Sequence, residues 1–227
     1  SMNPIKKGGT EMKKSIVSMM LALLLWMGCT AFAEAQRTIV ATTYPLYDIA
    51  QSVCGDLAQV VYAPQAAEKE AADADVLLCV GADADAWADS LKDVRVVKAL
   101  EGIDSIEGNA DALTIPVNCM ICASYFADAM NEIDPEHNDV YQDRLTAYVE
   151  SMISLDDHIR SAVQPNAKIS CPDGSMAYFA CEYGLTETDA AEAIALYTYN
   201  YPEDDLIGMP YAELLHANLH RLTGTED

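Results

Sequence analysis

The chain is 227 residues long, and its 36 acidic residues far outnumber its 13 basic ones, which gives a formal net charge of −23 at pH 7. A surface this acidic repels nucleic acid and anionic lipid and attracts cations, so a nucleic-acid partner is excluded. The length and the hydrophobic fraction of 51% allow one large domain or two small lobes.

Residues 12–33 have the organisation of a secretory signal peptide. Two lysines precede an apolar run over 16–27, and a small-x-small pattern ends at Ala33, where we expect cleavage. Cys29 lacks the aliphatic residue that a lipid-attachment site needs three places earlier. Residues 1–11 are interpreted as upstream read-through, because Lys-Lys-Gly-Gly can be encoded by a purine run resembling a ribosome-binding sequence. The protein is therefore predicted to reach the periplasm or outer face of a bacterial envelope, without a membrane span after cleavage.

Short strand and helix patterns alternate over residues 37–97, which is typical of an α/β lobe. Runs rich in β-branched and apolar residues predict strands at 37–44, 58–62, 75–80 and 94–97. Helices are predicted at 46–53 and 68–73, with a helical turn around Trp87 and Leu91. The apolar run at 75–80 is of the kind found in buried parallel strands.

A long predicted helix separates this α/β pattern from a second, shorter α/β pattern. A helix is predicted at 116–133. A second helix is predicted to begin at Asp134-Pro135, with the aspartate as its cap and the proline in its first turn. An apolar stripe runs along this second helix until Pro165 ends it. A strand at 167–170, a helix at 175–183, a strand at 193–199 and a helix at 211–222 follow. The predicted organisation is an N-terminal α/β lobe at 34–133, a linking helix at 134–165 and a reduced C-terminal α/β lobe at 166–227.

Four stretches together resemble the solute-binding proteins of bacterial zinc and manganese ABC transporters, of the zinc-uptake and adhesin type. They are residues 39–56, 72–91, 116–159 and 168–185. The third is the most specific, because it combines a Pro-x-Asn helix start, Asp-Pro, Tyr-x-x-x-Leu-x-x-Tyr and Leu-Asp-x-x-Ile. The resemblance implies two lobes with parallel-sheet cores joined by a long rigid helix, one divalent metal in the cleft between them, and delivery to a membrane permease.

The chain departs from the family pattern at the expected metal ligands. The loop that carries the first histidine ligand is missing, because Pro64-Gln65-Ala66-Ala67 runs almost directly into the next helix. The resemblance puts Asp111 at the second ligand position and Cys171 at the third. The fourth, acidic ligand falls on Glu203, Asp204 or Asp205. A stretch of the second lobe between 185 and 193 is also absent.

These positions support two hypotheses. In the first, Asp111, Cys171 and an acidic residue of 203–205 capture a divalent cation, with zinc favoured over manganese because a thiolate is a soft ligand. In the second, Asp111 is a solvated loop residue, Cys171 is a small buried hydrophobe, and the protein has lost the metal and serves as an exported interaction module.

Two of the cysteines form a motif that has both a functional and a packing interpretation. Cys119 and Cys122 form a C-x-x-C at a helix start, where thiol pKa values can fall, which gives a third hypothesis of thiol-disulfide chemistry. Without a thioredoxin-like context, packing or a local disulfide is the favoured interpretation. Spacing does not fix how the mature cysteines pair; they are Cys54, Cys79, Cys119, Cys122, Cys171 and Cys181.

The histidines and tyrosines carry weaker signals. His216 and His220 lie one helical turn apart and could chelate a metal, but they are interpreted as solvated, and His158 as a lone residue of the linking helix. Tyr197, Tyr199 and Tyr201 alternate as on one strand face and are interpreted as packing residues, with the lining of a cleft as the alternative. The chain has no Ser-His-acid order, phosphate-binding glycine loop or His-Glu-x-x-His motif, so we predict that it is not an enzyme.

Overall fold

The computed structural model describes residues 36–65, 67–81, 83–104, 106, 111–171 and 175–224. From Arg37 onward the chain belongs to one compact unit. The predicted signal peptide, Cys29 and the upstream residues lie outside the described residues. Within the described part, none of the helices combines the length and the apolar character that crossing a membrane requires.

A parallel sheet forms the first half of this unit. Its strands are β1 (Arg37–Ala41), β2 (Ala58–Tyr62), β3 (Val76–Cys79) and β4 (Arg95–Lys98), in the order β2-β1-β3-β4. Ile39 and Val40 point to opposite faces, and both are fully buried. A strand covered on both faces needs an apolar residue at every position, which explains the continuous apolar runs in the sequence.

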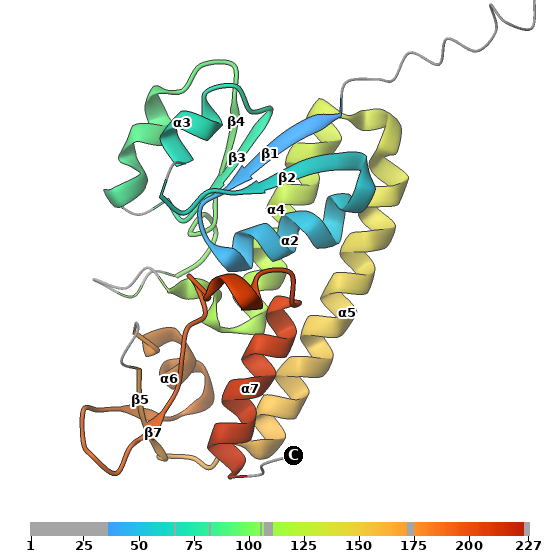
Figure 1. Ribbon diagram of the computed structural model, residues 1–227. Helices are drawn as coiled ribbons and strands as arrows, with labels where there is room; N and C mark the ends of the chain where they lie inside the picture. Colours follow the sequence, from blue (N-terminus) through green and yellow to red (C-terminus); the bar gives the residue numbers. More distant parts are fainter. Residues whose placement is uncertain are drawn as a thin grey trace, which may run out of the picture. The chain divides into compact units, whose positions relative to one another are not determined.

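Helices cover both faces of this sheet (Figure 1). The face that carries Ile39 packs in one core cluster with residues of α2 (Tyr44–Cys54), α4 (Pro116–Ile133) and α5 (Asn138–Ala162). The face that carries Val40 packs with Ala71 of α3 (Ala67–Ala71) and Ala88 of the 3-10 helix η2 (Asp83–Ser90). The predicted strands and helices of this half are all present, but the strand predicted at 37–44 ends at Ala41, and Tyr44 already begins α2.

The long helix begins after a separate turn. Asp134 accepts a hydrogen bond of 2.5 Å from the Tyr141 hydroxyl, and its carboxylate lies 2.9 Å from Nδ1 of His137. These contacts hold a 3-10 turn, η4 (Pro135–His137), ahead of α5. The buried face of α5 is the predicted apolar stripe, formed by Tyr141, Tyr148, Met152, Leu155 and Ile159.

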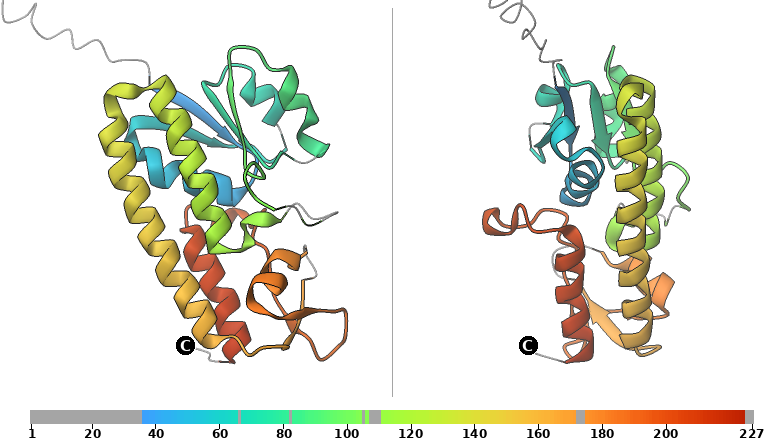
Figure 2. Two further views of the ribbon diagram at one scale, coloured as in Figure 1. Left: turned by 180° about the vertical axis from the view of Figure 1, so that it is seen from behind. Right: turned by 90° about the vertical axis from the view of Figure 1, so that its right-hand side faces the viewer.

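A smaller parallel sheet follows α5. Its strands are β5 (Lys168–Ser170), β6 (Thr186–Glu187) and β7 (Ile194–Ala195), in the order β6-β5-β7. The remaining elements are α6 (Ala177–Tyr183), η5 (Asp204–Leu206) and α7 (Tyr211–Thr223). Helix α7 packs along α5 (Figure 2). Two parallel sheets linked by a long helix, the second sheet being small, confirm the predicted fold class.

The strand predicted at 193–199 is wrong beyond Ala195. The Tyr197 N–H donates to Oδ1 of Asn218 (3.0 Å) instead of to a neighbouring strand, and Tyr199 has a φ of 53°, outside the extended region. Strand β6, which was not predicted, pairs with β5 through Thr186 and Glu187. Both residues are exposed, so this short strand has no apolar pattern to reveal it.

One hydrophobic cluster runs through both sheets. It includes Ile39 of β1, Leu155 of α5, Ile169 of β5 and Leu215 of α7. This shared core contains residues from before residue 133 and from after residue 165. The lobe boundaries predicted at 133 and 165 therefore stay a prediction.

Candidate functional site

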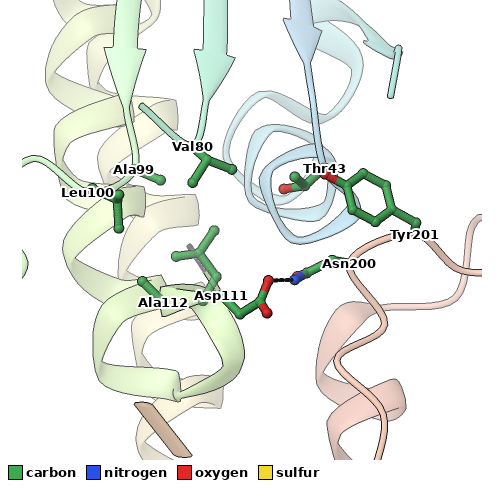
Figure 3. Close-up of a pocket in the computed structure, with 9 residues that line it drawn as sticks. Thr43, Val80, Ala99, Leu100, Asp111, Ala112, Asn200 and Tyr201 are labelled. Carbon is green, nitrogen blue, oxygen red and sulfur yellow. Dashed lines mark hydrogen bonds between the residues drawn. The ribbon is translucent and has the colours of Figure 1, made fainter. Parts of the chain in front are cut away.

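A cavity of about 40 Å³ lies at the carboxyl ends of β1, β3 and β4 (Figure 3). On the sheet side it is lined by Thr43, Val80, Ala99 and Leu100; on the other side it is lined by Asp111, Ala112, Leu113, Asn200 and Tyr201. The chain passes from β1 to β2 on one side of β1 and then crosses from β2 to β3 on the other side, so the cavity lies at a topological switch point where α/β sheets commonly bind ligands. Its volume suits a single ion or water molecule.

Asp111 connects three segments around this cavity. It is the N-cap residue of the 3-10 helix η3 (Ala112–Thr114). Its Oδ1 accepts a 2.5 Å hydrogen bond from Nδ2 of Asn200, which follows β7, and its Oδ2 accepts a 3.1 Å bond from the Ser175 N–H, which precedes α6. An ionised carboxylate accepts hydrogen bonds or coordinates a cation through either oxygen. Asp111 is therefore both a bridge between segments and a possible cation ligand.

A second carboxylate, Asp85, does not line the cavity but contacts the segment after β3 that does. Its Oδ2 accepts a 2.9 Å bond from the Gly81 N–H, just after β3. Burial raises the pKa of the Tyr201 hydroxyl, and the negative charges of Asp111 and Asp85 raise it further. Asp85 lies in η2, six residues after the end of β3, and was not among the residues predicted from the sequence.

Asn200 was also missed. Tyr201 lines the cavity, which is the alternative that the sequence leaves open for it. Asn200 is buried, its carbonyl accepts a 2.9 Å bond from the Tyr44 N–H at the start of α2, and its side chain reaches Asp111. Its position depends on contacts with residues far away in the sequence, so no local pattern could have identified it.

Cys171 lies at the end of β5 and is partly buried. The buried Tyr211 hydroxyl has a pKa well above its usual value, chiefly because it is buried. The Tyr211 hydroxyl itself donates to the carbonyl of Thr198 (2.9 Å).

The acidic residues 203–205 have a different environment. Glu203 lines a larger pocket of about 470 Å³ together with Tyr197, Tyr199 and Arg221, whereas Asp204 and Asp205 are exposed on η5. Asn200 and Tyr201 line both pockets. Across the described ranges, no three His, Cys, Asp or Glu side chains are grouped closely enough to hold a metal ion.

The C-x-x-C thiols face the core. Cys119 and Cys122 are buried on α4, and the Cys119 thiol donates to the Leu113 carbonyl (3.2 Å). Burial raises the pKa of Cys122 to about 12 and that of Cys119 well above its usual value, so neither is a reactive thiolate at neutral pH. None of the six cysteines from Cys54 to Cys181 forms a disulfide with another described cysteine. The geometry favours packing as the role of Cys119 and Cys122.

The sequence matches the family model described as zinc-uptake complex component A, periplasmic, over residues 39–196. The chain belongs to this family. The resemblance found in its four sequence stretches is thereby confirmed. The matched residues run from within β1 to the end of β7, and they include Asp111 and Cys171.

Two curated relatives of the family are similar in sequence. The iron-binding protein YfeA of Yersinia pestis is 28% identical over 183 residues, covering 67% of this chain and 59% of the relative. The zinc-binding lipoprotein AdcA of Streptococcus pneumoniae is 24% identical over 218 residues, covering 78% of this chain and 44% of the relative. The chain thus spans about half the length of these relatives.

Solved structures of the family share the fold. The Zn(II)-bound ZnuA-like domain of Streptococcus pneumoniae AdcA superposes with a TM-score of 0.72 at 19% identity, covering 84% of this chain and 99% of that chain. The metal-dependent lipoprotein YcdH of Bacillus subtilis gives a TM-score of 0.73 at 16% identity, covering 83% and 98%. The fold of this chain is therefore that of these solved structures.

Proposed function

We propose that this protein is the exported binding component of a metal ABC transporter, which captures a divalent cation in the cavity beside Asp111 and passes it to a membrane permease. The observation that carries the proposal is the position of this cavity, at the carboxyl ends of β1, β3 and β4 with a carboxylate on its opposite wall. The family assignment and the strongly negative charge of the chain support it.

The polar groups around the cavity suggest how an ion would be held. Asp111 would supply a carboxylate, and the side chains of Thr43, Asn200 and Tyr201 would supply neutral oxygens. Oxygen ligands alone favour manganese, whereas recruitment of the Cys171 thiolate would favour zinc. Glu203, Asp204 or Asp205 would complete the set of metal ligands if the 200–209 segment closed over the cavity. The metal preference therefore depends on Cys171.

An interaction module without metal is the second candidate. It is favoured by the hydrogen bonds of Asp111, whose two oxygens already accept bonds from Asn200 and Ser175. It also agrees with the lack, within the described residues, of three grouped metal-binding side chains. In this case Asp111 would act only as a bridge between segments.

A thermal melt separates the two candidates. The mature protein is melted in chelator, in Zn²⁺ and in Mn²⁺, alongside Cys171→Ser and the control Cys181→Ser, which removes an exposed thiol of α6. An ion at a hundred times its dissociation constant stabilises the fold by about 2.7 kcal/mol, which raises the midpoint by several degrees. If Zn²⁺ raises the unfolding midpoint of the wild type and of Cys181→Ser but not that of Cys171→Ser, the result supports the zinc site. No shift with any divalent ion would overturn the transport proposal.

A further inference from the structure

The larger pocket, of about 470 Å³, is formed by the segment 197–206 and by Arg221 of α7. Three tyrosines, Pro202, Leu206 and Glu203 line it together with Arg221. Pockets that hold small organic ligands have volumes of about 300–1,000 Å³, whereas the cavity beside Asp111 has room for a single ion. The size and the mixed lining of the larger pocket therefore suit a small molecule.

Buried contacts hold the wall of this pocket in place. The Tyr197 N–H donates to Oδ1 of Asn218 (3.0 Å), and Nδ2 of Asn218 donates back to the Tyr197 carbonyl. The Tyr211 hydroxyl donates to the Thr198 carbonyl (2.9 Å). Tyr199, the next residue, has a φ of 53°, a left-handed conformation that bulky residues rarely adopt. Such strain persists only where surrounding contacts impose it, and it clusters at ligand sites.

Arg221 differs from the other four arginines of the chain, because no carboxylate of the described residues pairs with it. Its guanidinium carbon lies 4.1 Å from the centre of the Tyr197 ring, and its Nη1 donates to the Ala195 carbonyl (3.0 Å). The other four are paired as follows: Arg37 with Asp75, Arg95 with Glu132, Arg144 with Asp56, and Arg160 with Asp156 and Glu182.

The contacts of Arg221 fix the plane of its guanidinium and use only one of its three nitrogens. Its Nε and Nη2 have no hydrogen-bond partner in the part of the chain that the structure describes. This edge of a guanidinium binds a carboxylate through two parallel hydrogen bonds. Arg221 is therefore placed to bind the carboxylate of a ligand in the pocket.

Glu203 brings the opposite charge to the same pocket. Its side chain is exposed, and it forms no ion pair with Arg221 or with another basic group of the described residues. A zwitterion offers a carboxylate to Arg221 and an ammonium group to Glu203. Because its net charge is zero, the charge of −23 on the chain does not repel it, whereas a simple anion would be repelled.

The tyrosines indicate the third part of the ligand. Tyr201 is 66% exposed, although it lines the pocket. A ring packed against it would bury apolar surface that the unliganded protein leaves in water, and aromatic pairs gain further from edge-to-face or offset contact. Leu206 and Pro202 add apolar surface to the same wall. An aromatic side chain on the ligand fits this lining.

We propose that this pocket binds a zwitterionic small molecule with an aromatic side chain, of which a free aromatic amino acid is the simplest. Arg221 binds the carboxylate, Glu203 binds the ammonium group, and the tyrosines contact the ring. This activity goes beyond the proposed cation capture and does not depend on it. Asp204 and Asp205 remain as candidate acidic ligands for the cation.

Saturation-transfer difference NMR of the mature protein with L-phenylalanine tests the proposal, in chelator so that no metal contributes. Three probes each lack one group: 3-phenylpropionate has no ammonium group, phenethylamine has no carboxylate, and glycine has no ring. Each should bind about tenfold or more weakly than phenylalanine in a titration. No transfer to phenylalanine, tyrosine or tryptophan would overturn the proposal, and so would equal binding of phenylalanine and phenethylamine.

Matched variants assign the two charged contacts. Arg221→Gln should weaken phenylalanine binding about tenfold or more and leave phenethylamine binding unchanged. Glu203→Gln should weaken phenylalanine binding and leave 3-phenylpropionate binding unchanged. Arg95→Gln is the control, because Arg95 also pairs with a carboxylate and donates to a backbone carbonyl but lies outside the pocket; it should change neither.

The two variants also separate binding from folding. Arg221→Gln loses the contact with the Ala195 carbonyl, so a thermal melt checks that the variant is folded. Glu203 is exposed and forms no ion pair within the described residues, so Glu203→Gln should melt like the wild type and tests the pocket by itself. Phenylalanine binding that is unchanged in Glu203→Gln, or in a folded Arg221→Gln, would overturn the proposal.

Discussion

The Asp111 carboxylate and the Asn200 amide are joined by a 2.5 Å hydrogen bond that connects the start of η3 to the segment after β7. The two residues are 89 positions apart in sequence. Since both line the small cavity, this bond controls the geometry of the proposed cation site. It also gives the sharpest test of whether an ion binds there.

Replacing Asn200 by aspartate puts a second carboxylate against Asp111. Two like charges at this distance repel strongly in a partly buried site, so Asn200→Asp should lose about 1–3 kcal/mol of unfolding free energy in chelator. Bound Mn²⁺ or Zn²⁺ should restore that loss, because a divalent ion neutralises both carboxylates. Urea denaturation with and without each ion measures both effects.

Asn200→Ala serves as the control for this prediction. It removes the same hydrogen bond without adding a charge, so its stability should fall in chelator and no ion should restore it to the wild-type value. If divalent ions restore the stability of neither variant, or restore the stability of both variants equally, a cation does not bind between these two side chains.

Asp48 on α2 gives the protein a defined dependence of stability on pH. Its Oδ1 accepts a 3.0 Å bond from the Tyr211 N–H at the start of α7, and burial raises its pKa to about 6. An unfolded aspartate has a pKa of about 3.9, so between about pH 4 and pH 6 the folded state binds more protons than the unfolded state. The contribution of Asp48 therefore falls as the pH rises through this window and is constant above it.

The substitution Asp48→Asn tests the direction of this pH dependence. The amide oxygen can still accept from Tyr211 but carries no charge, so the variant should match the wild type near pH 4 and exceed it by about 2 kcal/mol at pH 7.5. Urea unfolding at several pH values measures the difference between the two proteins, which cancels the contribution of the other carboxylates. A variant less stable than the wild type at pH 7.5 would contradict the prediction.

Gly55 is required where α2 ends. It begins the 3-10 helix η1 (Gly55–Leu57) and has a φ of 54°, and a Cβ built on it would lie 2.7 Å from Nη1 of Arg144. Arg144 cannot easily withdraw, because it donates to the Cys54 carbonyl and pairs with Asp56 at 2.8 Å. Gly55→Ala should therefore cost about 1–3 kcal/mol.

Chemical denaturation of Gly55→Ala, alone and combined with Arg144→Ala, separates the two causes. The backbone of Gly55 has a φ of 54° and a ψ of −121°, which strains any residue with a Cβ whatever its neighbours. If the clash with Arg144 contributes, Gly55→Ala should cost less in the Arg144→Ala background than in the wild type, and the loss that remains is the backbone part. Equal losses in the two backgrounds would show that Arg144 moves aside without cost.

The sequence predicts the parts of this fold that local patterns determine. The strand at 58–62 and the helix at 116–133 have the predicted bounds, because an apolar run and a Pro-capped helix are local signals. The site is harder to predict. Asp111 was identified through the family pattern, but its contacts with Asn200 and Ser175 depend on packing between residues 64 or more positions apart.

Thiol reactivity tests how the six mature cysteines are placed. Cys54, Cys79, Cys119 and Cys122 are buried, and burial raises the pKa of the first two to about 12 as well. Because the thiolate is the reactive form, none of these four should react with a thiol reagent in the folded protein at pH 7.5. Cys181 is exposed and should react rapidly, and the partly buried Cys171 more slowly.

Counting labelled thiols by intact mass before and after denaturation measures this pattern. The folded protein should take up one label quickly and a second slowly, and the denatured protein should take up six. Cys181→Ser should lose only the fast label, and bound Zn²⁺ should protect Cys171 if its thiolate is a ligand. Fast labelling at Cys119 or Cys122 would contradict the buried C-x-x-C and return thiol-disulfide chemistry to consideration.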